Sequence, residues 1–260
     1  MAAAIHTEWT KLRTLPSTWW LLAGVVTLTV AASAAITAGL PADDCAAGSC
    51  RADLVRQSLT GVWLGQAAVV VLGALTISAE YGTGTIRTSL TALPARLRLL
   101  TAKAVVVGGL ALCSGTLAVL GALGAGHLLL PGAFAKALGH PPISLTDGPT
   151  LRAAVGSVLY FALVALLALG VAAALRDTAA AVTAVLGLLY AFPLLVGMVH
   201  NDTWHERLER LSPASAGLAV QATKDLDQLP VGPWQGLAVL AGYAVSGLVL
   251  GGVLLKARDA

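Results

Sequence analysis

The feature that most constrains this chain is a set of six long apolar stretches that contain no Asp, Glu, Lys or Arg. Each is long enough to cross a bilayer as a helix, which takes about 20 predominantly apolar residues. The stretches are rich in Ala, Leu, Val and Gly without alternating polarity, which favours helices over the strands of a barrel. The sequence therefore predicts an all-α membrane protein, with one transmembrane domain over residues 1–260 and spans at residues 19–40, 59–79, 104–130, 153–175, 179–199 and 234–255.

Composition excludes several other classes of protein. Only 11% of the 260 residues are charged, whereas an ordinary soluble domain carries about 25%. The net charge of +3 is too small for a basic stripe that binds nucleic acid. The first apolar stretch is longer than the roughly 7–15 residues of a signal-peptide core, so we expect it to be retained as a span.

The distribution of charge predicts the orientation of the chain in the membrane. With the N-terminus inside, the inner segments hold nine basic and four acidic residues, a net charge of +5. The outer segments hold seven basic and nine acidic residues, a net charge of −2. An excess of Lys and Arg marks the cytoplasmic side, so we expect a multi-pass protein of the plasma membrane with both termini in the cytoplasm.

Two of the gaps between spans have a distinctive form. Asp177 lies in a very short gap between the fourth and fifth spans, which predicts a tight antiparallel hairpin. The gap at residues 200–233 is long and carries Trp204, Leu208 and Leu211 at helical spacing. This pattern is typical of short interfacial or re-entrant helices, although an ordinary solvated outer loop fits it equally well.

The N-terminal segment, residues 1–18, is predicted to form an amphipathic helix. Its apolar face comprises Ile5, Trp9, Leu12 and Leu15, with Glu8 and Lys11 on the polar side. Such a helix lies in the membrane interface with Trp9 at the depth of the headgroups. The alternative is a simple positively charged flank that contains Lys11 and Arg13.

Residues 80–103, between the second and third spans, form a longer segment than a simple connection requires. Gly82 and Gly84 permit a sharp bend, after which Ile86, Leu90 and Leu93 form one apolar face of a short helix. That face is a docking surface for a soluble partner. Glu80 and Arg87 could contact the partner, brace the loop against its own helices, or remain solvated at the interface.

These segments carry a resemblance to a known family. The chain resembles the permease subunits of ABC type-2 transporters in its six-span layout over the whole chain, and in three shorter segments, at residues 8–13, at residues 80–87 with Pro94 and Lys103, and at residues 256–259. The resemblance implies that Trp9, Lys11, Leu12 and Arg13 belong to an interfacial elbow helix. It also implies a coupling helix that docks on a cytoplasmic ATPase, with contributions from Glu80, Tyr81, Gly82, Gly84, Thr85, Ile86, Arg87, Leu90 and Leu93.

The energy source is constrained by what the sequence lacks. No Gly-x-x-x-x-Gly-Lys-Ser/Thr motif is present, so the chain has no phosphate loop of its own. The predicted spans contain no carboxylate, which an ion-coupled transporter would use as a relay; the nearest ionisable candidates are His127 and His200. This favours a permease driven by a separate subunit over a secondary transporter.

Other site signatures are weak. His205 and Glu206 begin a pattern that resembles the zinc-protease motif, but Glu209 stands where the second His is required, so no metal site is expected. Cys45 and Cys50 share an outer loop and form a disulfide if that face is oxidising. The Gly-x-x-x-Gly pairs at residues 61–65 and 247–251 could allow close helix contacts.

Together these observations lead to one expectation and several alternatives. We expect a non-enzymatic permease subunit that exports its cargo, dimerises with a second permease copy or a homologue, and has no cofactor of its own. ATP and Mg²⁺ would bind to the partner ATPase subunit. The export direction comes from the resemblance alone. A multi-span membrane enzyme, an ion-coupled transporter and a membrane protein without transport activity, such as an immunity factor, remain alternatives.

Overall fold

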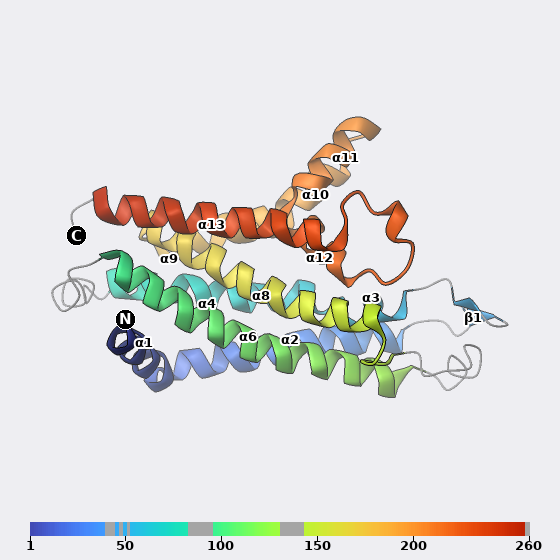
Figure 1. The fold of residues 1–260 in the computed structure, drawn as a ribbon, viewed down its shortest axis with the longest axis horizontal. Coiled ribbons are helices and arrows are strands. Elements are labelled where there is room, and N and C mark those ends of the chain that lie inside the picture. Colours follow the sequence, from blue (N-terminus) through green and yellow to red (C-terminus); the bar gives the residue numbers. More distant parts are fainter. Residues whose placement is uncertain (40–44, 47–48, 51–52, 83–95, 131–142, 258–260) are drawn as a thin grey trace.

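The computed structural model describes the chain except for residues 40–44, 47–48, 51–52, 83–95, 131–142 and 258–260. Over the described residues the architecture is all-α, apart from two strands of two residues each. Six helices are long and apolar enough to cross a membrane, and they lie lengthwise against one another in Figure 1. The predicted all-α architecture with six long apolar helices is therefore confirmed.

The long helices are α2 (Pro16–Ala38), α4 (Val62–Gly82), α6 (Arg96–Leu129), α8 (Gly148–Leu175), the continuous run Thr178–Gly197 and α13 (Pro233–Ala257). The run Thr178–Gly197 consists of α9 (Thr178–Leu186), the π-helix η2 (Gly187–Ala191) and α10 (Phe192–Gly197). Shorter elements are α1 (Ala2–Thr14), β1 (Cys45–Ala46), β2 (Ser49–Cys50), α3 (Leu54–Ser58), α11 (Asp202–Leu211), α12 (Pro213–Leu218), η3 (Ala219–Gln221) and η4 (Leu226–Gln228).

Two helix boundaries differ from the predicted spans in a way that matters for the site. Helix α6 begins at Arg96 rather than at residue 104, so Lys103 lies within the helix and not in a flanking turn. Helix α4 continues to Gly82 and therefore includes Glu80. Glu80 thus lies near the C-terminal end of α4, and Lys103 lies in the N-terminal part of α6. Those two helix ends lie at the end of the bundle where α1 lies (Figure 1).

Local capping explains the short hairpin between α8 and α9. Helix α8 ends where Arg176 adopts a left-handed conformation, with φ 60° and ψ 13°. Asp177 then caps α9 because its carboxylate accepts a hydrogen bond from the backbone N–H of Ala180 at 2.7 Å. The predicted tight turn is confirmed.

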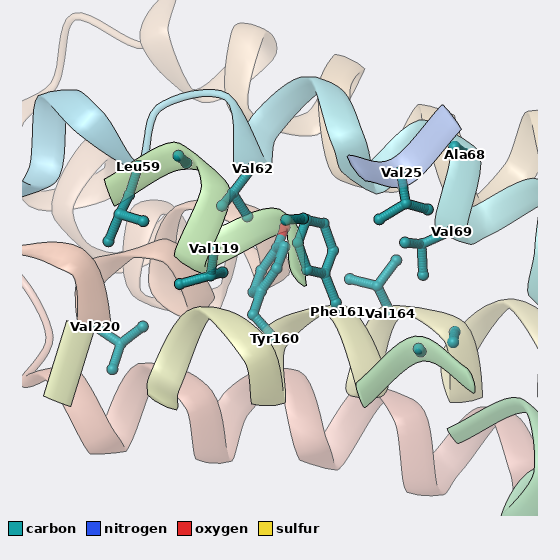
Figure 2. Close-up of a cluster of buried hydrophobic side chains, with 14 of the residues drawn as sticks. Val25, Leu59, Val62, Ala68, Val69, Val119, Tyr160, Phe161, Val164 and Val220 are labelled. Carbon is teal, nitrogen blue, oxygen red and sulfur yellow. The ribbon is translucent and has the colours of Figure 1, made fainter. Parts of the chain in front are cut away.

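The core lies along α4 and α8, which are the most deeply buried of the long helices. Val25 of α2, Val62 of α4, Val119 of α6 and both Tyr160 and Phe161 of α8 belong to one buried cluster (Figure 2). Glycines bring the helices together at both predicted motifs. A Cβ on Gly61 would lie 2.0 Å from the carbonyl oxygen of Thr29, and one on Gly251 would lie 2.6 Å from that of Gly170.

The segment at residues 200–233 is mostly helical, so it is not an ordinary solvated loop. Helix α12 and the 3-10 turn η3 are buried against α8 and α13. Their fit is tight, since a Cβ on Gly236 would lie 1.9 Å from the carbonyl oxygen of Ala216. Helix α11 projects away from the bundle in Figure 1, and its Trp204 and Leu211 are exposed.

The orientation can be tested by labelling single cysteines in a variant without native cysteines. We expect Arg98→Cys to be protected from an impermeant thiol reagent in intact cells and Asp225→Cys to react. The reason is the excess of basic residues in the segments that include Arg98. Labelling of Arg98→Cys from outside would place residues 83–95 beyond the reach of any cytoplasmic partner.

The predicted disulfide concerns residues whose backbone is paired in a short hairpin. Strands β1 and β2 are antiparallel, and Cys45 lies directly opposite Cys50. Directly opposed residues in such a ladder have Cα atoms about 4.5–5.5 Å apart, which falls within the range that a disulfide spans. The two side chains are outside the described part of the structure. We expect mass spectrometry of unreduced peptides to find these residues linked; two free thiols in protein taken directly from cells would refute the bond.

Candidate functional site

The N-terminal helix α1 is attached to the bundle through a face that contains a charged residue. Its buried residues are Ala4, Glu8 and Leu12, which are spaced one turn apart. The prediction that Glu8 lies on a solvated polar side is therefore wrong, because this residue is only 2% exposed. Trp9, by contrast, is 43% exposed.

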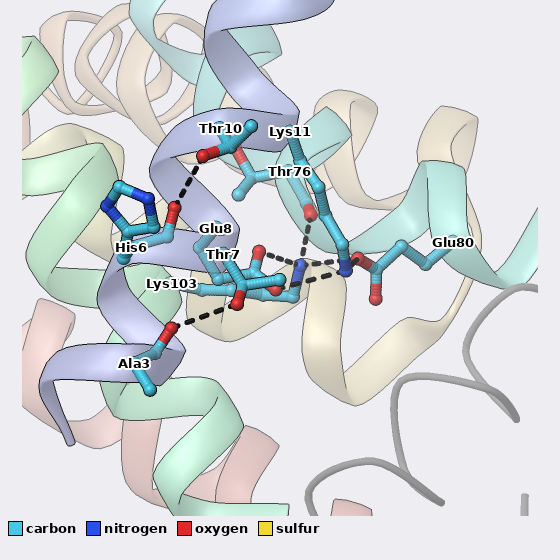
Figure 3. A network of polar contacts seen from close by, with 9 residues as sticks. All are labelled: Ala3, His6, Thr7, Glu8, Thr10, Lys11, Thr76, Glu80 and Lys103. Atoms are coloured by element: carbon cyan, nitrogen blue, oxygen red, sulfur yellow. Dashed lines mark hydrogen bonds and ion pairs between the residues drawn. The ribbon is translucent and has the colours of Figure 1, made fainter.

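Glu8 is buried because it meets a lysine from α6. Lys103 Nζ donates to Glu8 Oε2 at 2.7 Å, to Glu80 Oε1 at 2.8 Å and to the carbonyl oxygen of Thr76 at 3.0 Å. Lys11 Nζ contacts the same carboxylates, at 3.1 Å from Glu8 Oε1 and 2.9 Å from Glu80 Oε1. Figure 3 shows these four side chains, here called the charge cluster, meeting from α1, α4 and α6.

The charge cluster is electrically balanced, with two ammonium groups and two carboxylates. Lys103 and Glu8 are 1% and 2% exposed, so neither charge could be accommodated there without its partners. Lys11 lies at the solvent side, with a side chain that is 40% exposed. Burial alone would lower the pKa of Lys11, but its hydrogen bond to Glu80 and the charges of Glu80 and Glu8 outweigh this and raise it. Lys11 therefore stays charged at neutral pH.

The same end of α4 also contacts the hairpin between α8 and α9. Thr178 Oγ1 donates to Ser78 Oγ at 2.7 Å. The Arg176 guanidinium lies over the ring of Tyr81, 5.2 Å from its centroid, at a distance typical of a cation–π contact. The last turns of α4 thus connect α1, α6, α8 and α9 at one end of the bundle.

The structure describes only part of the predicted coupling segment. Glu80, Tyr81 and Gly82 form the end of α4, and both Glu80 and Tyr81 contact the chain's own helices. Of the three interpretations of Glu80, bracing against its own helices agrees with these contacts, and a solvated charge is wrong because the residue is 9% exposed. The remaining predicted residues, Gly84, Thr85, Ile86, Arg87, Leu90 and Leu93, lie outside the described residues.

Sequence analysis did not identify Glu8 and Lys103 as a pair. They are 95 residues apart, and each lies beside other charges that resemble an ordinary solvated flank. A usable signal would have been Lys103, about two turns inside a helix extended back to Arg96. Within the predicted elbow helix, Leu12 is buried, Lys11 joins the charge cluster and Arg13 is exposed.

A second polar feature lies within the apolar part of the bundle and is uncharged. The Tyr160 hydroxyl donates to Gln66 Oε1, and both residues are fully buried. Tyr190, within the π-helix η2, donates to the carbonyl oxygen of Trp63 at 2.5 Å and packs edge-on against the Trp63 ring. Gln66 Nε2 has no hydrogen-bond partner among the described residues. These side chains are neutral and can form hydrogen bonds, but they do not supply the carboxylates that a proton relay uses.

No metal centre is found in the part of the chain that the structure describes, since no three His, Cys, Asp or Glu residues come together there. His205 Nε2 lies 3.6 Å from Glu209 Oε2, which is a pair within one helix and not a set of converging ligands.

No family model matches the chain, and no curated protein shows significant sequence similarity to it.

Proposed function

We propose that this chain is the permease subunit of an ABC type-2 transporter and is driven by a separate cytoplasmic ATPase. The observation that carries the proposal is the charge cluster, which joins α1 to the two helices on either side of residues 83–95. A force applied to that segment would reach α4 and α6 directly. It would reach α1 through Glu8 and Lys11 in the same movement.

The contacts of α4 extend this path to the rest of the bundle. Ser78 and Tyr81 contact Thr178 and Arg176 at the hairpin between α8 and α9. Helix α8 in turn packs along α13 through the close approach of Gly170 to Gly247. Rigid, closely packed elements move together rather than deform. Docking at one loop could therefore shift several spans at once, as alternating access requires.

The charge cluster is also a reason to prefer an external energy source over ion coupling. Its carboxylates are each bound to two lysines, and the cluster lies at one end of the bundle. A transporter driven by protons or sodium needs ionisable or oxygen ligands near the middle of the membrane. The buried pair of Gln66 and Tyr160, among the described residues of the spans, is neutral.

The proposal also includes the direction of transport and the assembly state. Export by a dimer of permease subunits follows from the resemblance of residues 8–13 and 80–87 to the family. The chain would contribute no catalytic residue and no cofactor. ATP and Mg²⁺ would be bound and used in the partner subunit.

Co-purification tests this proposal. The permease would be expressed with a stand-alone ATPase encoded beside its gene, extracted in mild detergent and isolated through a tag on the permease. We expect a stable complex that contains both subunits, and we expect it to be lost when Ile86→Asp places a charge on the proposed docking face. Absence of any complex with the wild-type permease would contradict the proposal.

A further inference from the structure

A groove of about 350 Å³ lies between α6 and α13, at the end of the bundle that carries the charge cluster. Its α6 wall includes Leu97 and Leu100, and its α13 wall includes Leu248, Gly252 and Val253. Lys256 lies at the end of the α13 wall, in the last turn of that helix. The groove is therefore apolar along its length and carries a positive charge at one end.

Gly252 keeps this groove open. A Cβ at this position would lie 3.1 Å from Leu97 Cδ2, so any larger side chain would enter the space between the helices. Leu97 and Val253 are 42% and 56% exposed, which means that the groove opens to the surroundings of the bundle. At this position along two membrane-crossing helices, those surroundings are acyl chains and headgroups.

A second cation, Arg96, is held near the same end of α13. Arg96 Nη1 donates to the carbonyl oxygen of Leu255 at 2.8 Å, which holds its guanidinium one residue from Lys256 along α13. Among the residues that the structure describes, those lining the groove include no Asp or Glu. Basic pockets between membrane helices attract the anionic headgroups of the cytoplasmic leaflet, and guanidinium and ammonium groups both bind phosphate oxygens.

We infer that this groove binds one anionic phospholipid, with an acyl chain along the leucine-lined walls and the phosphate beside Lys256 and Arg96. The shape and charge fit an amphiphile with a long apolar tail and a single anionic head. A zwitterionic lipid would bring its own cation close to Lys256 and Arg96 and would bind less well. This lipid site is inferred from the contacts between α6 and α13 alone, so it does not depend on the transport proposal.

Native mass spectrometry tests the site with defined lipids. The purified full-length chain would be equilibrated with mixed micelles of phosphatidylglycerol and phosphatidylcholine, and retained lipid would be counted. We expect one phosphatidylglycerol to remain on the wild-type chain after mild activation. Lys256→Gln is expected to lower its affinity roughly five-fold, the effect of one basic residue at a membrane surface, and Lys256→Arg to restore it.

Gly252→Leu tests the apolar part of the groove and has a matched control on the same helix. A leucine at residue 252 would occupy the space of the acyl chain and abolish retention. Gly242→Leu should not, because a Cβ there meets no atom within 4 Å. Arg13→Gln, which removes an exposed charge from α1, should likewise leave retention unchanged. Equal retention of both lipids by the wild type, or equal loss in all variants, would overturn the inference.

Discussion

Replacing Lys103 with methionine is expected to lower the free energy of unfolding by about 3–5 kcal/mol, the typical cost of removing one partner from a buried ion pair. The change would leave Glu8 and Glu80 buried beside a single lysine that lies at the solvent side. Methionine has a similar length, so the loss would arise from charge rather than from a cavity. The measurement is the unfolding free energy of the purified chain in detergent or nanodiscs.

Two variants separate the charge effect from a general loss of packing. Glu8→Met combined with Lys103→Met leaves the balanced pair of Lys11 and Glu80, and we expect it to be more stable than Lys103→Met alone. Lys11→Met should cost about 1 kcal/mol or less, because its side chain is 40% exposed. A double variant less stable than the single one would show that the charge cluster does not hold α1 as described.

Ile86→Asp is expected to abolish ATP hydrolysis stimulated by the permease while the chain still inserts and folds. In the sequence pattern Ile86 belongs to the apolar face that we propose as the docking surface. Loss of an apolar anchor at the centre of an interface typically costs more than 1–2 kcal/mol. Ser89→Asp, three residues further along and outside the apolar pattern of Ile86, Leu90 and Leu93, is the matched control and should keep most of the stimulation. Undiminished stimulation with Ile86→Asp would show that residues 80–103 only connect two spans.

Glu80→Ala with Arg87→Ala is a less specific test of coupling than Ile86→Asp. The carboxylate of Glu80 accepts hydrogen bonds from Lys103 and Lys11, and its removal would leave Lys103 with Glu8 as its only carboxylate partner in the cluster. This variant should therefore lose stability as well as coupling. A loss of ATPase stimulation in this variant would identify a docking defect only if its unfolding free energy matched that of the wild type.

The sequence was sufficient to predict the helical spans, because the free-energy cost of placing charge in hydrocarbon leaves a pattern that a single chain displays. The hairpin at Asp177 was also predictable, since it depends on local geometry. The Gly-x-x-x-Gly pairs indicated that Gly61 and Gly251 could allow close helix contacts, but not which helix each of them meets.

The charge cluster could not be predicted in the same way. Whether Glu8 is solvated or buried depends on Lys103, which belongs to a helix 95 residues away. Helical periodicity placed Glu8 opposite the apolar residues of α1 and so predicted solvent, but the partner made burial possible. The groove that Gly252 leaves open between α6 and α13 depends on a contact between helices that no single-chain pattern encodes.

The most direct test of an externally driven permease is the ATP hydrolysis rate of the partner ATPase, measured alone and after assembly with this chain in nanodiscs. We expect the rate to rise on assembly with the wild-type permease and to stay at the level of the ATPase alone with Ile86→Asp. If the ATPase hydrolyses ATP at the same rate alone, with the wild-type permease and with the variant, then work does not enter the bundle through residues 80–103.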